Sequence, residues 1–595
     1  MKLFGDGLRS LAVARRFVPW LAEHRLRLAG VAGAGLAAAA LEVLRPWPIQ
    51  ALFDYALVPS GEPPLPFGSV VALCVSASLL VIAARAAVEY WGALRQAEVA
   101  HDVTRSLRRH VFEQLTKLPL SFHAANKSGD MIVRLMGDVP MLRTMLVDSA
   151  VALLSRVMLV LATLGVMLAM DPLLTLVICA VIPVLFLVVR MISRRITSAV
   201  RKQRKKEGAM ADWLHEAVAG VAVIQSLGRG PDAVRRFARS SRSEARAGLK
   251  AMRLAARLSF TVESLLAAAF AGTLGLGAWR VSQGRLSPGE LLVFLSYVRG
   301  MLKPIRAVSR HAERIARGTA CGERILSVLD ASVDVSSPPG APRAPEHPRE
   351  LAYDGVGFRY GDGPLVLSDV NIVFRPGELT GLFGRSGAGK STLTSLALRL
   401  ADPSEGVLRL DGIDLTSLDL DSLRARFGLC LQETVLFGDS VRENLALGAP
   451  DASDDDLWRA LAAVAADDVV RALPDGLEHV LGSIGTGLSG GQRRRLTLAR
   501  TLLRDPPVLL VDEPFAGLDR PAARTVLATL KAHAEHAIVL VVCHELDHLE
   551  AFDRIVFLER GRVVGDDSHA HLQASCPAYA ELVARTALDE SEVLL

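Results

Sequence analysis

The residue pattern with the clearest chemistry lies between residues 384 and 392. It reads GRSGAGKST, a complete G-x-x-x-x-G-K-[ST] pattern, preceded by a strand-like segment, ELTGLFG, and continued by a helical one, TLTSLALRL. Glycines in such a loop let backbone N–H groups wrap around phosphates, and the helix N-terminus adds positive potential. Lys390 would reach the β- and γ-phosphates, and Ser391 would supply an oxygen to Mg²⁺. The predicted phosphate-binding residues are Gly384, Arg385, Ser386, Gly387, Ala388, Gly389, Lys390, Ser391 and Thr392.

Two adjacent carboxylates follow a second buried strand. The apolar run VLLV ends in Asp512 and Glu513, which is typical of a parallel strand that delivers its last residues to the carboxyl edge of a sheet. Asp512 would hold the magnesium shell, and Glu513 would polarise a water molecule for in-line attack on the γ-phosphate. The alternative is an acidic strand end that only begins a turn at Pro514. It is disfavoured because adjacent carboxylates at a sheet edge repel each other without a cation.

Further segments, all in one family's order, accompany these two patterns. The sequence Leu488-Ser489-Gly490-Gly491-Gln492, which ends 20 residues before Asp512, resembles the signature motif of ATP-binding cassette proteins. Four single residues resemble, in turn, the family's adenine-stacking aromatic residue, Q-loop glutamine, D-loop aspartate and switch histidine: Tyr360, Gln432, Asp519 and His544. A lone Tyr in a turn or a lone His at a strand end is usually structural, so their register with the phosphate loop is what favours these roles.

The resemblance implies a division of work among these residues. Glu513, His544 and Gln432 would be catalytic, and Ser391, Gln432 and Asp512 would hold Mg²⁺ beside ATP. Two cassettes of this family dimerise head to tail, so that the signature of one chain, Ser489 to Gln492, contacts the γ-phosphate held by Lys390 of the other. A single chain would therefore not form a complete site.

The N-terminal half has the composition of a membrane domain. Hydrophobic residues make up 51% of the 595 residues and the mean hydropathy is +0.32, mainly because of long Ala/Leu/Val runs. Six spans are predicted, at residues 28–53, 69–90, 147–170, 172–191, 258–279 and 286–302. The segments 95–143, 190–257 and 303–324 are rich in Arg and Lys, which predicts cytoplasmic termini and a cytoplasmic cassette. The loop 278–290, with Arg280 and Arg285, is the weak point of this charge pattern.

The predicted architecture is multi-domain: an all-α six-helix transmembrane domain at residues 1–330, a Pro-rich linker at 331–350 and an α/β P-loop cassette at 351–595. Two inner loops of about 50 to 65 residues are expected to extend the membrane helices. This order resembles an exporter-type half-transporter. By that likeness, short helices at residues 123–129 and 210–216 would dock on the cassettes near Gln432. Charges within the spans should pair or line a cavity: Glu42, Arg85, Glu89, Arg156 and Glu263.

Two segments depart from the exporter pattern. Exporters commonly have a glutamate before the signature, where this chain has Ser483, which leaves the coupling details open. The run from Asp512 to Asp519, DEPFAGLD, is more like that of importers and other cassette ATPases. Neither change removes a group that contacts phosphate.

The sequence therefore predicts ATP-driven export of an amphipathic or hydrophobic substrate, such as a drug, lipid, peptide or glycolipid. The half-transporter would work as a dimer, with a homodimer favoured and a heterodimer possible, in a bacterial plasma membrane. Importers of the same build, cassette-driven signalling or gating proteins, and a soluble NTPase with an apolar anchor are the alternatives. Nucleic-acid binding is disfavoured because the net charge of +5 arises beside apolar segments. Six scattered cysteines and no histidines at metal spacing indicate no zinc site.

Overall fold

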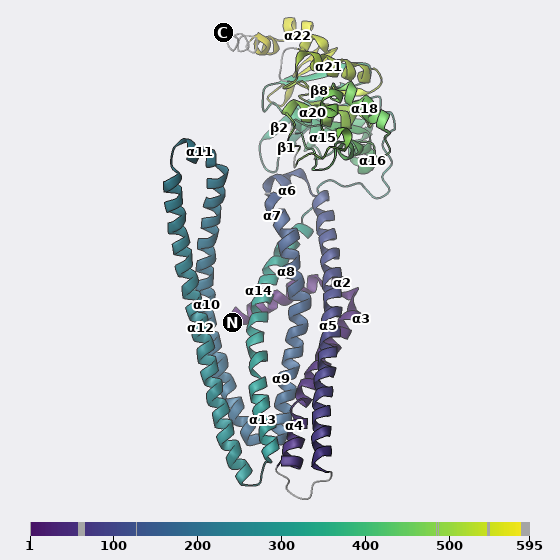
Figure 1. Ribbon diagram of the computed structural model, residues 1–595. Helices are drawn as coiled ribbons and strands as arrows, with labels where there is room; N and C mark the ends of the chain where they lie inside the picture. Colours follow the sequence, from purple (N-terminus) through teal and green to yellow (C-terminus); the bar gives the residue numbers. More distant parts are fainter. Residues whose placement is uncertain are drawn as a thin grey trace. The chain divides into compact units, whose positions relative to one another are not determined.

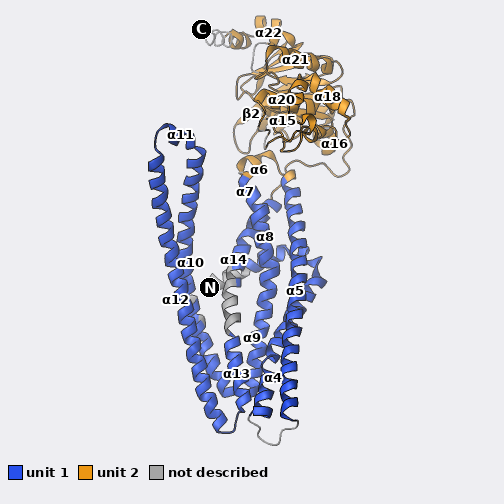
Figure 2. Cartoon of the chain, in the orientation of Figure 1, with its two compact units in different colours: residues 1–115, 129–330 blue, residues 116–128, 331–595 orange. Residues whose placement is uncertain are grey.

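The computed structural model describes residues 2–57, 66–126, 128–432, 434–482, 485, 487–543 and 548–584. The chain divides into two compact units (Figure 2). Unit 1 comprises Met1–Leu115 and Gly129–Asp330, and unit 2 comprises Thr116–Ser128 and Ala331–Leu595. Each unit has its own elements, which Figure 1 labels in chain order.

Unit 1 is helical throughout its described length. Its elements are α1 (Lys2–Arg16), α2 (Val18–Ala22), α3 (Arg25–Leu44), α4 (Trp47–Leu52), η1 (Phe53–Leu57), α5 (Phe67–Lys117), α7 (Ser128–Val133), η2 (Arg134–Asp138), α8 (Val139–Arg143), η3 (Thr144–Ser149), α9 (Ala150–Met170), α10 (Pro172–Ala219), α11 (Val221–Ser226), α12 (Gly230–Ser282), α13 (Pro288–Gly300) and α14 (Leu302–Leu329). The helix α6 (Leu120–Ala125) belongs to unit 2.

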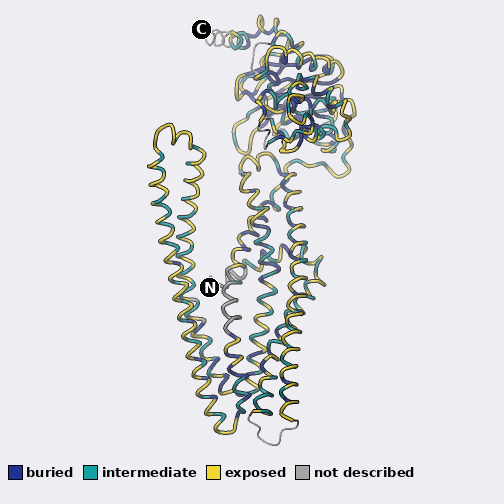
Figure 3. Tube along the Cα trace, viewed as in Figure 1, coloured by how far each residue is buried: buried dark blue, intermediate teal, exposed yellow. Residues whose placement is uncertain are grey.

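Five helical stretches are long and apolar enough to cross a membrane: Arg25–Leu57, Phe67–Lys117, Ser128–Met170, Pro172–Ala219 and Gly230–Ser282. They contain the first five predicted spans, and only 11–24% of the residues in their apolar windows are buried, as suits helices that face lipid (Figure 3). The sixth predicted span, 286–302, falls on α13 and the turn at Met301. With 13 residues, α13 alone is shorter than the roughly 20 that a span needs.

Three helices are much longer than a membrane span, so the two long loops continue the spans as helices, as predicted. α5, α10 and α12 have 51, 48 and 53 residues, or roughly 70–80 Å each, against about 30 Å of hydrocarbon. α10 and α12 lie side by side (Figure 1), joined by hydrogen bonds from Gln203 to Glu244 (2.7 Å) and from Lys206 to Ser243 (2.7 Å). The predicted helix at 210–216 is wrong as a separate element, because α10 continues until Gly220 caps it and the short helix that follows is α11.

Charged residues in unit 1 pair with one another. Arg85 forms ion pairs with Glu42 and, at 2.9 Å, with Glu89, as predicted for charges within the spans. Arg280 pairs at 2.6 Å with Asp171, whose side chain also accepts hydrogen bonds from the first backbone N–H groups of α10. The positive-inside rule counts Lys and Arg rather than net charge, so this ion pair leaves the loop 278–290 as the weak point of the predicted orientation.

Unit 2 contains two sheets. The first, in the order β2-β1-β4-β5, is antiparallel and consists of β1 (Leu351–Arg359), β2 (Leu365–Phe374), β4 (Glu405–Leu410) and β5 (Ile413–Asp414). The second, in the order β10-β9-β3-β8-β7-β6, consists of β3 (Leu379–Gly384), β6 (Phe427–Cys430), β7 (Val508–Asp512), β8 (Ile538–Val542), β9 (Arg554–Glu559) and β10 (Arg562–Asp567). All its strands run parallel except β10.

Helices cover the parallel sheet of unit 2. They are α15 (Lys390–Ala397), α16 (Leu420–Ala425), α17 (Val441–Ala446), α18 (Asp454–Ala463), α19 (Asp467–Arg471), α20 (Gly490–Leu502), α21 (Arg520–Ala534) and α22 (His569–Ser575). Every residue of β3, β7 and β8 is buried, and alternate side chains enter two apolar clusters. One cluster lies toward the antiparallel sheet and the other toward the helices, as expected of parallel strands covered on both faces. The carboxyl ends of these strands therefore share one edge.

Candidate nucleotide-binding site

The phosphate loop joins β3 to α15, as predicted. Gly387 and Gly389 have positive φ angles of 79° and 106°, a backbone conformation that favours glycine. A Cβ on Gly384 would lie 2.3 Å from the carbonyl oxygen of Leu558, and one on Gly389 would lie 2.6 Å from the side chain of Leu367. These positions therefore require glycine. Since the first N–H groups of a helix have no acceptor within the helix, the start of α15 can donate to an anion.

Lys390 is buried at the start of α15 and is 5% exposed. Its Nζ donates hydrogen bonds to the carbonyl oxygens of Gly384 (2.6 Å) and Arg385 (3.1 Å), so it lies back over the loop. Burial lowers its pKa, and the negative charges of Asp512 and Glu513 oppose that shift. A desolvated ammonium group held only by carbonyl oxygens would interact strongly with phosphate oxygens.

Asp512 ends β7 at the carboxyl edge of the sheet, where it pairs in register with Val542 of β8. Burial, and then the charge of Glu513, raises the pKa of the Asp512 carboxyl to about 6, against the opposing charges of Lys390 and Arg494. Glu513 has a φ of 52°, which is uncommon for a residue with a side chain, and its backbone N–H donates to the carbonyl of Val542 (2.9 Å). Such strain is common at functional sites.

Gln432 joins this edge from β6, which pairs with β7. Its Nε2 donates a 2.9 Å hydrogen bond to Oε2 of Glu513, so the predicted Q-loop residue contacts the predicted catalytic carboxylate. Arg494 of α20 is a residue that sequence reasoning missed. It donates to the carbonyl oxygens of Gln432 (3.4 Å) and Ala516, and so connects the Q-loop with the D-loop. One signal for Arg494 was present in the sequence, namely its position two residues after Gln492 in the helix that follows the signature.

Tyr360 lies beside the phosphate loop at the end of the antiparallel sheet. Its hydroxyl is 3.1 Å from Oγ1 of Thr392, and the ring of Phe358 packs edge-on against it with centroids 4.8 Å apart. The residue is 56% exposed. An aromatic ring that is anchored on two sides but open to solvent is suited to stacking on a base.

The signature forms the N-terminus of α20. Ser489 and Gln492 make a capping box: Oγ of Ser489 accepts from the N–H of Gln492 (3.2 Å), and Oε1 of Gln492 accepts from the N–H of Ser489 (2.8 Å). Gly491 packs closely on the D-loop, since a Cβ there would lie 2.6 Å from the carbonyl oxygen of Gly517. Asp519 caps α21 by accepting from the N–H of Ala522 (3.1 Å). Gly490 has open space around it.

Two sequence predictions lie outside the described residues, namely the switch histidine His544 and the departure at Ser483. Among the hydrogen bonds and ion pairs of the described residues, none joins the signature to residues 384–392.

The chemistry of the candidate metal ligands fits Mg²⁺. Ser391 offers a hydroxyl, Gln432 an amide and Asp512 a carboxylate, and oxygen donors are those that Mg²⁺ prefers. Burial and the charge of Glu513 raise the pKa of Asp512, so a bound cation would further favour its ionised form.

Comparisons with known proteins agree with this geometry. The model of the ABC transporter transmembrane region matches residues 34–305, and that of the ABC transporter family matches residues 367–516. An ATP-dependent lipid A-core flippase of Chromobacterium violaceum is 32% identical over 483 residues, which cover 81% of this chain and 82% of the relative. A flippase of the same name from Thiobacillus denitrificans is 32% identical over 487 residues, covering 81% and 84% of the two chains.

A solved structure extends the likeness to three dimensions. It is that of a bacterial Atm1-family ABC exporter with ATP bound, with a TM-score of 0.80 and 26% sequence identity. The match covers 95% of this chain and 98% of the other. The uncharacterized ABC transporter ATP-binding protein YwjA of Bacillus subtilis is 29% identical, over 83% of this chain and 85% of the relative.

Proposed function

Because the chain belongs to the ABC transporter family, as a membrane-spanning half-transporter fused to its cassette, we propose that it is a homodimeric lipid exporter of the bacterial plasma membrane. That it is an ATP-hydrolysing, multi-pass exporter that works as a dimer follows from the matched family models and the exporter fold. The lipid class is the part that we infer. Its support is that relatives 32% identical are lipid A-core flippases, and that the spans expose apolar faces with few charges.

The observation that carries the ATPase mechanism is the contact of Gln432 with Glu513 beside buried Lys390. In the proposed mechanism the N–H groups at the start of α15 and the Lys390 ammonium bind the β- and γ-phosphates. Glu513, held by its backbone bond to Val542 and by Gln432, accepts a proton from the water that attacks the γ-phosphate. When bound, Mg²⁺ would be held by Ser391, Gln432 and Asp512 and would neutralise charge on the phosphates.

The proposed site is completed by the second chain. Ser489 is the N-cap residue of α20 and fixes the start of that helix through the capping box. A helix N-terminus attracts anions. Open space at Gly490 would let a phosphate approach the backbone there. Since this chain carries a complete phosphate loop, Glu513 and a signature, a homodimer would have two complete sites. His544, outside the described residues, would orient the γ-phosphate in each.

The proposed orientation places the cassette in the cytoplasm. Its support is the excess of Arg and Lys in the long extensions of α5, α10 and α12. In the proposed cycle, ATP-bound cassettes close on each other, the helical extensions transmit that closure, and hydrolysis resets the transporter.

The test is ATP hydrolysis by the purified full-length chain in lipid nanodiscs, with lipid A-type glycolipids, phospholipids, drugs and peptides added in turn. Stimulation by a lipid class alone, in a chain purified without any partner, is the expected result. Stimulation by drugs or peptides but not lipids would overturn the substrate class. An inactive chain that becomes active with a second half-transporter would overturn the homodimer. Glu346→Gln, an exposed glutamate of the linker, serves as the control for charge-removing variants.

A further inference from the structure

Three side chains converge at the amino ends of β7 and β8, on the edge of the sheet opposite to the phosphate loop. Asp505 lies between α20 and β7, His533 lies in the last turn of α21, and His536 lies in the connection to β8. One ligand atom from each lies within 4.8 Å of the others. We propose that these residues form a binding site for a divalent transition-metal ion, best matched by Zn²⁺, separate from the nucleotide site.

The separations between the donor atoms suit a tetrahedral ion. Nδ1 of His533 and Nε2 of His536 lie 3.6 and 3.5 Å from Oδ1 of Asp505. Zinc bonds of about 2.0–2.1 Å place neighbouring ligands roughly 3.3–3.4 Å apart in a tetrahedron. These two separations therefore need little change. The third separation, between the ligand nitrogens of the two histidines, requires only that the exposed His536 ring swings toward His533. Two imidazoles with one carboxylate is a ligand set that zinc uses, with a fourth position left for water.

A hydrogen bond to a backbone carbonyl orients the buried histidine. His533 is 8% exposed, and its Nε2 lies 2.9 Å from the carbonyl oxygen of Pro506. Because a carbonyl can only accept, Nε2 carries the proton, and neutral His533 presents the lone pair of Nδ1 toward Asp505. Metal-binding histidines are oriented in this way, by donating from the other ring nitrogen to a carbonyl or carboxylate.

A purely structural contact accounts for the cluster less well. At 3.5 and 3.6 Å, neither imidazole makes a hydrogen bond with Asp505. A cation bound between the three groups would satisfy all of them at once.

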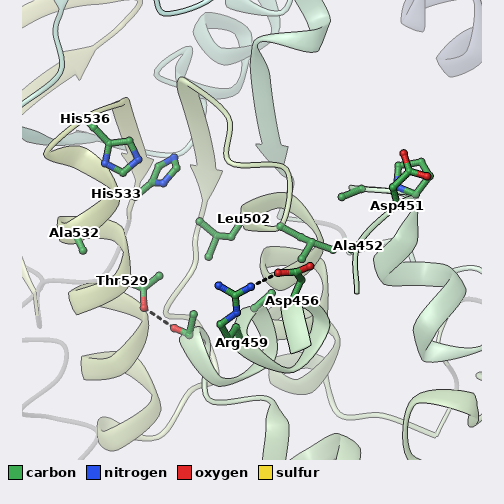
Figure 4. Close-up of a pocket in the computed structure, with 14 residues that line it drawn as sticks. Asp451, Ala452, Asp456, Arg459, Leu502, Thr529, Ala532, His533 and His536 are labelled. Carbon is green, nitrogen blue, oxygen red and sulfur yellow. Dashed lines mark hydrogen bonds and ion pairs between the residues drawn. The ribbon is translucent and has the colours of Figure 1, made fainter. Parts of the chain in front are cut away.

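The site is open to solvent on one side. His533 and His536 line a surface cavity of about 750 Å³, where Figure 4 shows the two rings next to each other at the end of α21. Asp505 and His536 are themselves exposed, so an ion can enter without unfolding. Arg459, which also lines the cavity, forms an ion pair with Asp456, and its charge is therefore neutralised.

The position of the site suggests what the ion does. α20 begins at the signature and ends just before Asp505, and α21 begins at the D-loop and ends at the two histidines. The signature and the D-loop pack on each other at the opposite ends of these helices, at Gly491 and Gly517. An ion bound here would tie together the far ends of the two helices that carry these motifs, and so stabilise their arrangement.

The test measures Zn²⁺ binding to the full-length chain, purified through a tag without histidines and stripped with a chelator selective for transition metals. Competition with a chromophoric chelator gives stoichiometry and affinity. We expect one tight site per chain, unaffected by excess Mg²⁺, and a higher melting temperature with Zn²⁺. His536→Ala, and Asp505→Asn, which keeps a residue that tolerates positive φ, should each weaken binding by about 10- to 100-fold and abolish the thermal shift.

His571→Ala is the matched control. His571 is as exposed as His536 and lies 3.7 Å from Asp567, but the structure places no second histidine with that pair among the described residues. Equal Zn²⁺ affinities for wild type, His536→Ala and His571→Ala would overturn the proposal. Zn²⁺ binding must also persist in Lys390→Ala and Glu513→Gln. Loss of binding in those variants would assign the ion to the nucleotide site and contradict a separate one.

Discussion

The cassette and the membrane bundle hold their important residues in different ways. In the cassette, a few side chains are positioned at the ends of buried parallel strands, where distant motifs come into contact, as Gln432 does with Glu513. In unit 1, most residues of the long apolar helices are exposed (Figure 3). The charges there pair with one another, as Arg85 does with Glu42. Activity should therefore be sensitive to single changes in the cassette and tolerant of most single changes in the bundle.

The largest effect is expected for Glu513→Gln. The substitution keeps the shape of the side chain but removes the group that accepts the proton from water, so ATP hydrolysis should fall by about 10²- to 10⁴-fold. ATP binding, measured by equilibrium binding of a fluorescent analogue, should be retained. Glu346→Gln should hydrolyse ATP like the wild type. Turnover of Glu513→Gln within threefold of the wild type would remove Glu513 from the chemistry.

The second largest effect is expected for Lys390→Ala. The loss of a buried cation that binds phosphate should weaken ATP affinity by roughly 10- to 100-fold, because hydrogen bonds to charged groups contribute about 1.5–3 kcal/mol. Titration with the same nucleotide analogue measures it. Unchanged affinity would mean that the carbonyl contacts of Lys390 with Gly384 and Arg385 persist when nucleotide binds.

These two predictions rest on residues that could be identified from the sequence, because a phosphate loop and a strand ending in carboxylates each specify local geometry. Contacts between motifs that are distant in the sequence, such as the Q-loop and the D-loop, could not be predicted from it. Arg494 connects the Q-loop and D-loop only because α20 and β6 are brought together by the sheet. The cluster of Asp505 with His533 and His536 depends likewise on a loop from another part of the chain, which is why the sequence alone predicted no zinc site; two histidines at i, i+3 were too weak a signal by themselves.

The bundle was predictable in composition but less so in its boundaries. Hydropathy located five spans, yet the short helix expected at 210–216 lies within α10, which continues until Gly220, and the separate short helix is α11. The sixth span was drawn across the turn at Met301, since apolar composition continues through it. Gly300 and Pro304 flank this break, and they were the signal for it in the sequence.

A smaller effect, within the bundle, is expected for Asp171→Asn. Asn can still cap α10, but the ion pair with Arg280 is lost, so the stability of unit 1 should fall by about 1–2 kcal/mol. The measurement is the melting temperature in detergent together with ATPase activity, and activity at room temperature should remain within about twofold of the wild type. A loss of hydrolysis as large as that of Glu513→Gln would contradict the contrast between the two regions.

The smallest effect is expected for Leu80→Ala on α5. Leu80 is 70% exposed, and truncation of an exposed apolar side chain creates no buried cavity. Stability should change by less than about 0.5 kcal/mol, with unchanged ATP hydrolysis. Melting temperature and ATPase assays on the same preparation check this. A large loss of stability would indicate that this face of α5 packs against protein in the dimer rather than against lipid.

The most direct test of the account asks whether two chains share each ATP site. Chains with Lys390→Ala and chains with Gly490→Glu would be reconstituted separately and as mixed dimers. The fold should tolerate Gly490→Glu because Gly490 has open space around it. We predict no hydrolysis from either alone and about a quarter of wild-type activity from an equal mixture, since half the dimers have one intact site. A chain with both substitutions should not recover activity with the wild type in their mixed dimers. Failure of the single variants to complement, with mixed dimers verified, would contradict a signature that acts across the dimer.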